Sequence, residues 1–546
     1  MFRNHLKRWG LLAVIAFAAV GASAQAEDPP ERVAALSHTE GSVAFAPAGE
    51  TEWSDAILNR PITRGDRLWT DPGGRAEVHL GSAALHLASQ TFVEVKTLDD
   101  DVLQLALNEG TMNARVRELE GGENFEITTP QLSFRAAQPG DYRIDVDTTS
   151  GYTRVTVRSG VAMIYGAGKG VMQLRAGQQM AFTGRQLATV AVPAPIEDAF
   201  DRWAADRNRA EDQSIAARYV PREVVGYQEL DANGVWSQDP DYGPVWYPTI
   251  SVTDWAPYRY GRWEWIVPWG WTWIDEARWG FAPFHYGRWA HIHSRWAWVP
   301  GRIDRHPVYS PALVAFVGGS GANWNLSIAS GPGIGWFPLA PGEAWRPTYR
   351  ASTAYLRSVN RNAVFNNAGF TFQHRPEAIT AVRIEDFQRG APVHQHWSGV
   401  SGDSLSRLQV NSQPVLPQPR RYADANRTAQ PRPQPQMQYV APIPSAAPTP
   451  PKRQRIQEQQ RPRQLPQQAQ RAQEGRQLPQ MQKQRQQQRE AARQQERTQH
   501  ALAPPRRQLP AQAPAPAQEH SNGHHGAERS AQGEDEGNRG RGRGHF

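Results

Sequence analysis

Apolar and polar side chains alternate in short runs from Val33 to Val192, and glycine, proline, asparagine and aspartate separate the runs. A period of two residues is typical of strands that turn one face to a core and the other to water. The clearest runs lie at 76–80, 92–95, 112–116, 125–127 and 142–146. The pattern predicts an antiparallel all-β domain over residues 31–192, with its sheets packed around one core.

The spacing of apolar residues changes after residue 192. Ile196, Phe200 and Trp203 recur at a helical spacing, with acidic residues in the first turn. We therefore expect a short amphipathic helix in a linker over residues 193–215. Trp203 lies on the apolar stripe and is predicted to dock on a neighbouring domain. The charged stretch 206–212 is predicted to be solvated.

Tryptophan dominates the next segment, because 12 of the 20 tryptophans lie between residues 236 and 298. The sequence YGRW at 260–263 returns at 286–289, and the Trp-x-Trp pair at 271–273 returns at 296–298. Such a period predicts repeated β-hairpins with alternate indoles on one face, and Trp246-Tyr247-Pro248 is interpreted as an earlier copy. One hairpin cannot bury itself, so the copies are expected to pack together in a Trp-rich domain over residues 216–400.

The tryptophans admit two interpretations. They can form the core of a domain that has few aliphatic residues, or some can stay exposed as a stacking platform for sugar rings or for aromatic or proline-rich ligands. Arginines beside them are expected to stack on aromatic rings within the repeat. The candidate ligand-binding residues are Trp263, Trp265, Trp269, Trp289, Arg262 and Arg288.

Charge and complexity separate the end of the chain from the rest. Residues 401–546 hold 23 basic and 11 acidic side chains, a net charge of +12, whereas residues 27–400 carry −8. Glutamine, proline, arginine and alanine dominate, and Gln-Leu-Pro-Gln occurs at both 464–467 and 477–480. With little to bury, this tail is predicted to be disordered. It can act as an electrostatic anchor on anionic surfaces or as a plain spacer.

The first residues resemble an export signal. Arg3, Lys7 and Arg8 precede the apolar run 11–20, and Ala24-Gln25-Ala26 forms a small-residue cleavage pattern. The run is too short to span a membrane, which favours a cleaved signal peptide over residues 1–26, with an uncleaved anchor as the alternative. We expect an exported protein that is located in the periplasm, in the outer envelope or outside the cell. The chain contains no cysteine, which excludes disulfides and thiolate chemistry.

The predicted β domain contains a series of spaced motifs, at 64–70, 74–78, 107–110, 125–130 and 155–160. In these motifs it resembles the FecR-like extracytoplasmic β domain. The resemblance implies an all-β fold outside the cytoplasm. In the family's name-giving members the domain relays an outer-membrane signal to a cytoplasmic sigma factor. Here the one hydrophobic segment is interpreted as a signal peptide, so only fold and compartment are expected to carry over.

The Trp-rich region also shows a family pattern. Tyr242-Gly243-Pro244-Val245-Trp246-Tyr247-Pro248, the two YGRW copies and Gly335-Trp336-Phe337-Pro338-Leu339-Ala340-Pro341-Gly342-Glu343 resemble an uncharacterised Trp-rich domain family of proteobacterial secreted proteins. That resemblance implies no known activity.

The search for catalytic chemistry finds no G-x-S-x-G, H-E-x-x-H or P-loop pattern. His285, His291 and His293 could share a strand face, but no carboxylate lies at a suitable spacing, so neither a metal nor a cofactor is predicted. The sequence predicts a non-catalytic binding or scaffold protein that contacts an envelope polymer or protein, with no specific nucleic acid. A signalling accessory that senses an outer-membrane partner and a glycan-processing enzyme are the alternatives.

Overall fold

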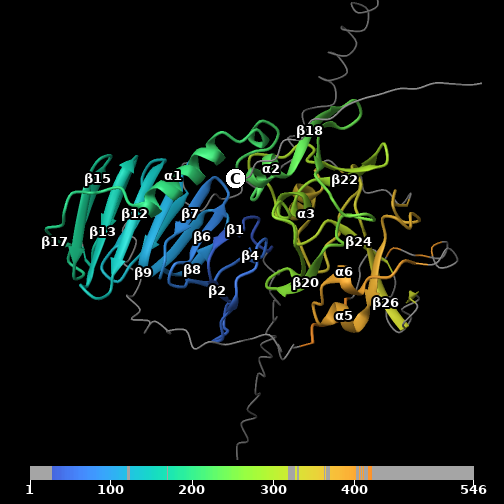
Figure 1. Ribbon diagram of the computed structural model, residues 1–546, viewed down its shortest axis with the longest axis horizontal. Coiled ribbons are helices and arrows are strands. Elements are labelled where there is room, and N and C mark those ends of the chain that lie inside the picture. The colour runs from blue at the N-terminus through green and yellow to red at the C-terminus, as the bar shows by residue number, and fades with distance from the viewer. Residues whose placement is uncertain are drawn as a thin grey trace, which may run out of the picture. The chain divides into compact units, whose positions relative to one another are not determined.

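The structure is a computed structural model that describes residues 28–420, with gaps at 120–122, 169, 318–325, 329–330, 362 and 364–368. Of residues 401–415 it describes only Leu405, Leu408 and Val410. The predicted signal peptide and the predicted tail from residue 421 onward lie outside the described residues. Strands predominate, which confirms the predicted all-β class (Figure 1). No helix of the described part is both long and apolar enough to cross a membrane.

The first module is built from two sheets that share the long strand β9 (Val102–Val116). Residues 102–109 of β9 pair with the strands of layer B, and residues 110–116 pair with those of layer A. Gly110 marks the change, at a φ of +90° that disfavours residues with a side chain. Its absent Cβ makes room for the carbonyl of Gln90, which would lie 2.4 Å from a Cβ.

The order of the strands in each layer differs from their order in the chain. From one edge to the other, layer A contains β4 (Pro61–Ile62), β1 (Ala34–Glu40), β6 (Arg75–Leu80), β7 (Ala83–Leu87), β9, β12 (Gly140–Asp147), β13 (Tyr152–Ser159), β16 (Gln179–Thr183) and β17 (Ala188–Val190). Layer B contains β3 (Ser54–Asp55), β2 (Val43–Ala46), β5 (Arg67–Thr70), β8 (Phe92–Leu98), β9, β10 (Asn124–Thr128), β11 (Ser133–Ala136), β14 (Val161–Tyr165) and β15 (Val171–Arg175). The pairs are antiparallel except β9 with β10.

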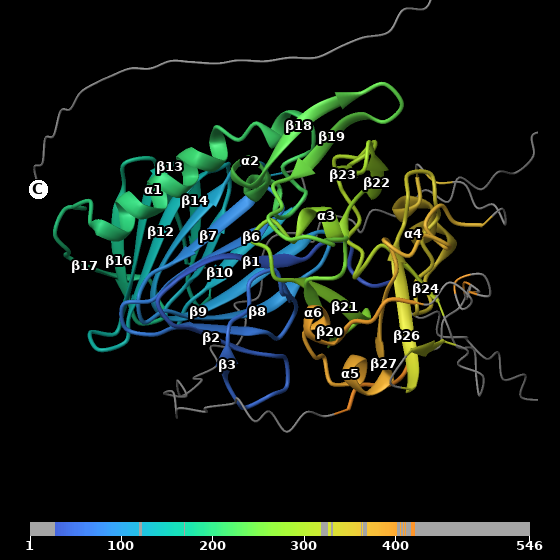
Figure 2. The same cartoon turned by 45° about the vertical axis from the view of Figure 1, so that its right-hand side comes forward.

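The predicted alternation fills the core between the layers, but the outer face of layer A is not in water. Helix α1 (Ala199–Asp212) lies across that face (Figure 2). Beneath it the polar residues Glu77, His79, His86 and Asn113 are buried. The expectation of a solvated face is therefore wrong there, because a segment distant in sequence covers it.

Helix α1 begins at Asp198, whose side chain accepts a hydrogen bond from the amide of Asp201 in a capping box. Ile196 precedes this cap and is exposed, so it does not belong to the helix stripe. Trp203 docks on the β domain as predicted: its Nε1 donates to Glu40 over 2.7 Å, and its ring packs edge-on against His86. The stretch 206–212 is not simply solvated, because Asn208 and Glu211 are buried.

The second module contains the predicted hairpins, which are confirmed. They are β18 (Gly234–Asp239) with β19 (Gly243–Pro248), β20 (Gly261–Ile266) with β21 (Gly270–Asp275), and β22 (Arg288–Ile292) with β23 (Arg295–Val299). Strand β19 joins β23 through the pair Trp246 and Trp298, so the first and third hairpins form one sheet. The second hairpin is a separate two-stranded sheet.

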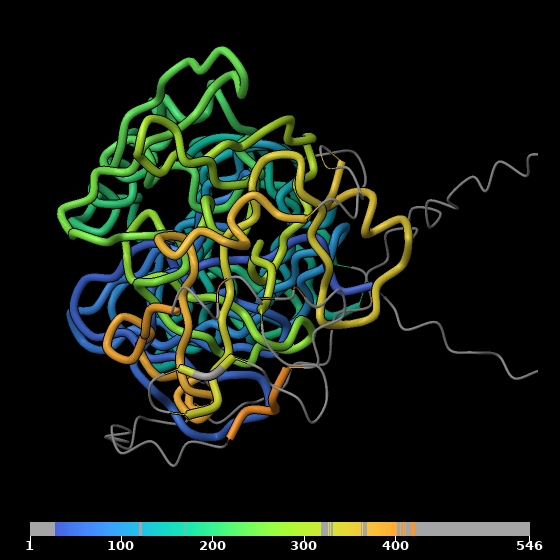
Figure 3. The backbone as a smooth tube through the Cα atoms, turned by 90° about the vertical axis from the view of Figure 1, so that its right-hand side faces the viewer, coloured from blue at the N-terminus to red at the C-terminus, as the bar shows by residue number. Residues whose placement is uncertain are grey.

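A further sheet and several short helices complete the module, which faces the viewer in Figure 3. The sheet holds β24 (Val314–Val317), β25 (Ser327–Ile328), β26 (Gly331–Pro338) and β27 (Thr380–Arg383). The helices are α2 (Leu230–Asn233), α3 (Ala282–His285), α4 (Thr353–Val359), α5 (Ile384–Gln388) and α6 (Val393–His396), with 3₁₀ turns at Ala216–Arg218 and Tyr227–Glu229.

The hairpins share one packing device. A glycine stands at the first position of each hairpin or directly before it, and an atom of an indole on the opposite strand lies 2.4–2.7 Å from where the Cβ of that glycine would be. The pairs are Gly234 with Trp246, Gly261 with Trp273 and Gly287 with Trp298. The repeat in the sequence is thus a repeat of glycine–indole contacts.

We expect Gly261→Ala to lower the free energy of unfolding by about 1–3 kcal/mol, because the new methyl group would overpack the contact. A Cβ there would lie 2.3 Å from the carbonyl of Ile274 and 2.6 Å from the ring of Trp273. Chemical denaturation followed by tryptophan fluorescence measures the effect. Gly399→Ala is the control, because nothing lies within 4 Å of a Cβ at that position. Equal stability of the two variants would contradict the steric argument.

Direct contacts join the two modules. Asn59 of the β domain donates to the carbonyls of Asp275 and Ala277 over 2.9 and 2.6 Å, and the carboxylate of Glu264 pairs with Arg60 over 3.2 Å. Val33 and Ala35 belong to the core of the Trp module. The first strand of one module therefore helps to close the core of the other.

The folded part extends beyond residue 400, where the tail was predicted to begin. Leu408 and Leu416 are buried in the core of the Trp module, and Val410 forms a bridge with Val317. The predicted boundary at residue 400 was therefore wrong. The segment after it has a low-complexity composition, and its few isolated apolar residues, which pack on the module, show no periodic pattern in the sequence.

Candidate functional site

The predicted stacking platform is mostly interior. Trp263, Trp269 and Trp289 are each 1% exposed, and only Trp265, at 42%, offers a ring to solvent. The interpretation as a ligand platform is therefore wrong for the first three residues. Physically, the hairpin segment 234–299 contains no leucine and few other aliphatic residues, so its indoles fill the core together with aliphatic side chains from the rest of the module.

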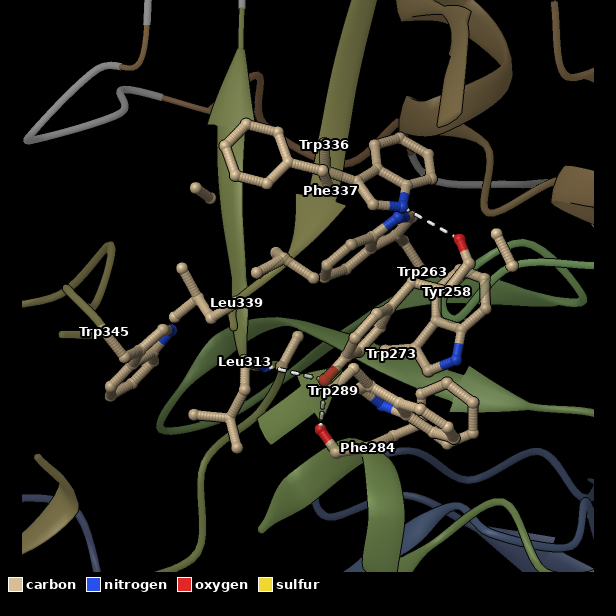
Figure 4. Close-up of a cluster of buried hydrophobic side chains, with 14 of the residues drawn as sticks. Tyr258, Trp263, Trp273, Phe284, Trp289, Leu313, Trp336, Phe337, Leu339 and Trp345 are labelled. Atoms are coloured by element: carbon tan, nitrogen blue, oxygen red, sulfur yellow. Dashed lines mark hydrogen bonds between the residues drawn. The ribbon is translucent and has the colours of Figure 1, made fainter. Parts of the chain in front are cut away.

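Trp263 lies at the centre of this core (Figure 4). Its ring meets Trp273 at 5.5 Å and Trp336 at 5.3 Å, both edge to face. Tyr258 ties the cluster together: its hydroxyl donates to the carbonyl of Phe284 over 2.8 Å and accepts from the amide of Leu313 over 3.1 Å. These contacts assign the cluster a structural role.

The two predicted arginines also differ from expectation. The guanidinium of Arg288 donates to the carbonyl of Glu343 over 3.0 Å and to Oδ1 of Asn360 over 3.1 Å, so it ties two loops to β22. Burial lowers the pKa of Arg288 to about 10. Arg262 is half-buried on β20. Stacking on rings is instead made by Arg259 over Trp397 and by Arg295 over Tyr247, which the sequence pattern did not single out.

Arg288 borders a cleft of about 310 Å³, which we call the polar cleft. The loop 299–308 and helix α4 contribute to its walls. The polar and charged residues that line it include Tyr242, His285, Arg288, Arg302, Asp304, His306, Ser310, Ser358 and Arg361. Arg361 and Asp304 form an ion pair with each other. The size is within the range of small-molecule sites.

Two buried groups of the cleft have unmet hydrogen-bonding capacity. His285 is fully buried, and its Nδ1 lies 2.8 Å from the carbonyl of Ser310, to which it must donate. Burial lowers the pKa of His285 to about 4 against the opposing effect of nearby carbonyls, so the ring is neutral and Nε2 is an acceptor. Neither Nε2 nor the Ser310 hydroxyl has a hydrogen-bond partner. Other buried side-chain polar atoms of the described residues also have no partner, and these two stand out because both residues line the polar cleft, where a polar ligand or water can reach them.

The pair does not have the geometry of an activated serine. The His285 ring bonds to the main-chain carbonyl of Ser310, and the Ser310 hydroxyl makes no hydrogen bond. A nucleophile and its base must share that hydrogen bond. The arrangement therefore offers an acceptor and a donor to a ligand, but not a serine–histidine nucleophile.

The three histidines considered as metal ligands do not converge. His285 is in the core, His291 packs on Trp296 with ring centres 4.9 Å apart, and His293 is exposed in the turn between β22 and β23. The expectation that His293 lies on a strand was wrong. Within the described residues no group of three or more His, Cys, Asp or Glu side chains is placed to hold a metal ion.

A second hollow, of about 560 Å³, lies at the start of α1 and is lined by Arg143, Arg154 and Arg158. Each of these arginines is paired: Arg143 and Arg154 contact Asp145 over 2.9 and 3.0 Å, and Arg158 contacts Asp201. The positive charge there is already neutralised by the protein's own carboxylates. The polar cleft is therefore the better candidate site.

Comparisons with known proteins find similarity for part of the chain. Residues 227–343 match a family of unknown function (DUF6600). Two solved structures of a proposed anti-sigma factor from Parabacteroides distasonis are similar, at 19% and 18% identity and a TM-score of 0.21 each. Each match covers 23% of this chain and 57% of the other, so the chain spans little more than half the length of these proteins. No curated protein matches the chain.

Proposed function

We propose that the protein is an exported, non-catalytic binding or scaffold protein of the cell envelope, and that it holds its ligand in the polar cleft. The observation that carries the proposal is the pair of unpartnered buried groups, His285 Nε2 and the Ser310 hydroxyl, in a cleft of about 310 Å³. The site differs from the exposed aromatic platform, which was one of the two interpretations of the sequence.

The chemistry of the cleft favours a polyhydroxylated ligand. A neutral imidazole nitrogen accepts a hydrogen bond, and a serine hydroxyl both donates and accepts. A sugar hydroxyl can satisfy both groups at once, and Tyr242 adds an aromatic edge at the cleft. An envelope glycan is the ligand class that combines these properties.

The contacts between the modules suit a scaffold. Two hydrogen bonds from the Asn59 side-chain amide to main-chain carbonyls, together with the ion pair of Arg60 with Glu264, hold the second hairpin against the β domain. A ligand bound to one module is therefore held at a defined place relative to the other. The tail adds a charge of +12 over residues 401–546, which attracts anionic polymers in a salt-dependent manner.

We expect Ser358→Tyr to weaken retention of the full chain on purified peptidoglycan by about tenfold or more, because the new ring would fill the cleft. Ser358 is half-buried on α4 and lines the cleft. The matched control is Arg357→Tyr, which places the same ring on the exposed neighbouring position of the same helix. Dissociation constants from sedimentation of the polymer with bound protein measure the difference.

Retention on peptidoglycan measured at low and high salt, with and without the tail, distinguishes binding in the cleft from the alternatives. Retention that survives high salt but is lost in Ser358→Tyr supports the cleft. Retention that vanishes with salt and with deletion of residues 421–546 indicates electrostatic adhesion alone. Equal binding by the two tyrosine variants would contradict the proposal that the ligand binds in the polar cleft. Capture of an outer-membrane protein without polymer binding would favour the signalling alternative.

A further inference from the structure

A short proline-containing segment of the chain lies against the second hairpin. It consists of Leu416-Pro417-Gln418-Pro419-Arg420. Leu416 is only 9% exposed and belongs to the aromatic core, and the carbonyl of Pro417 accepts a hydrogen bond from Nε1 of Trp271 over 2.7 Å. The end of α5 completes the contact, because the Gln388 side chain donates to the carbonyl of Gln418 over 2.9 Å and the Arg420 amide donates to the Gln388 carbonyl over 3.0 Å.

The surface that receives this segment has the composition of a peptide groove. Trp271 and Gln388 contact the segment directly, Phe387 packs on Trp271 with ring centres 4.5 Å apart, and Trp265 stands edge-on to Trp271 at 5.8 Å. We call the surface formed by Trp265, Trp271, Phe387 and Gln388 the Leu-Pro groove. An aromatic wall with an indole N–H donor is the usual receptor for extended proline-containing peptides.

The contacts define what the groove requires. It buries a leucine and bonds to main-chain carbonyls, whereas the side chains of Gln418 and Arg420 are exposed. A leucine followed by proline is therefore the essential element, and proline favours the extended backbone that presents its carbonyl to the indole.

The same element recurs later in the sequence. Leu-Pro-Gln occurs at 465–467 and 478–480, and Leu-Pro at 509–510, each time directly after Arg-Gln. These copies lie outside the described residues. They belong to the basic part of the chain, whereas residues 27–400, which contain the groove's wall, carry a net charge of −8. Charge complementarity thus favours the encounter of one copy's tail with another copy's body.

We propose that the Leu-Pro groove binds a Leu-Pro-Gln segment from the tail of a second copy of this chain, in exchange with the chain's own residues 416–418. Each chain carries the groove in its described part and several Leu-Pro elements beyond it, so the contact is head-to-tail and can link copies in series. This self-assembly is independent of the ligand in the polar cleft, and it supplies a means by which a scaffold protein spreads over a surface.

Self-association of the full chain tests the proposal, measured by sedimentation velocity over about 1–100 μM, a range that suits weak peptide contacts. We expect concentration-dependent assembly, strengthened by Leu416→Ser, which empties the groove. The triple variant Leu465→Ser, Leu478→Ser and Leu509→Ser should weaken assembly by tenfold or more. The matched control is Gln464→Ser, Gln477→Ser and Gln508→Ser, which should assemble as the unchanged chain does. Trp271→Phe keeps a ring but removes the donor, and it should weaken assembly.

Equal assembly of the two triple variants would overturn the proposal, as would a monomeric state of both the unchanged chain and Leu416→Ser. Assembly lost only on addition of salt, whichever triple variant is used, would indicate charge alone and also overturn it. Where Leu416→Ser loses its near-ultraviolet circular dichroism, the unchanged chain is used instead. A photo-crosslinking peptide Arg-Gln-Leu-Pro-Gln-Gln should then label residues 265–271 or 384–388, and labelling elsewhere counts against the groove.

Discussion

Replacing Trp263 by alanine is expected to lower the free energy of unfolding by about 3–5 kcal/mol, the range for a large aromatic residue lost from a packed core. Its ring is 1% exposed, and the rings that pack on it lie with their centres 5.2–5.7 Å away; they belong to Trp273, Phe316, Trp336 and Phe387. These rings come from separate sheets and a helix, so the cavity cannot close by a local shift. Denaturant unfolding at constant pH measures the loss.

Trp265→Ala is the matched control, because the residue lies two positions away on the same strand and the same face. Trp265 is 42% exposed, so its loss should cost about 1–2 kcal/mol, clearly less than that of Trp263. Equal losses for the two variants would contradict the division into a buried and an exposed indole. The Trp265→Ala variant should also keep its binding to the ligand of the polar cleft.

The hairpins were predictable from the sequence, and so was an indole-filled core, but which indoles would be buried was not. Strand period and the repeated Gly-Arg-Trp place Trp263 and Trp265 on one face, and the register pairs them with Trp273 and Trp271. A Trp-x-Trp pair has the same pattern in a core and in a platform. Burial is decided by the side chains that pack on the indoles. For Trp263 these include Trp336 and Phe387, which lie about 70 and 120 residues further along the chain.

The polar cleft, too, could not be predicted from the sequence. His285 was noticed as a possible metal ligand, but its partner Ser310 lies 25 residues later in a stretch with no periodic pattern. The signal for the site is an unmet hydrogen bond in a buried place, which exists only after folding. In the same way, Glu77 and His79 have the alternation of solvent-facing residues, and only α1 turns their face into an interior.

Glu77 is the centre of that interior polar network. Its carboxylate accepts from Nε and Nη2 of Arg207 over 2.6 and 2.9 Å and lies 2.9 Å from Nε2 of His79. Burial alone would raise the pKa of Glu77, but hydrogen bonds from Arg207 and His79, with Nε2 of His86 3.3 Å away, outweigh it and hold the pKa well below its ordinary 4.5. Burial would lower the pKa of His79, but Glu211 and Glu77 outweigh that effect and raise it above 6.5.

These shifts set the pH range in which α1 is held most firmly. A depressed carboxylate pKa adds stability above pH 4.5 that is lost as the pH falls through the lower folded value. A raised histidine pKa adds stability below pH 6.5 that is lost as the pH rises through the higher folded value. Both contributions are complete between pH 4.5 and 6.5, where we expect the β domain with α1 to be most stable.

Glu77→Gln is expected to lower the free energy of unfolding by about 2–3 kcal/mol at pH 6, because it removes the buried carboxylate to which Arg207 and His79 both bond and leaves Arg207 with Glu229 as its remaining ion pair. The control is Glu40→Gln, since Glu40 is 44% exposed and pairs with Arg75 at the edge of the helix, where removal of an ion pair costs about 1 kcal/mol or less. The stability of Glu77→Gln should also change less between pH 6 and pH 3 than that of the unchanged chain, because the carboxylate that titrates is gone. A loss no greater than that of Glu40→Gln, or an unchanged pH profile, would show that α1 is held by its apolar contacts and that the buried charges contribute little.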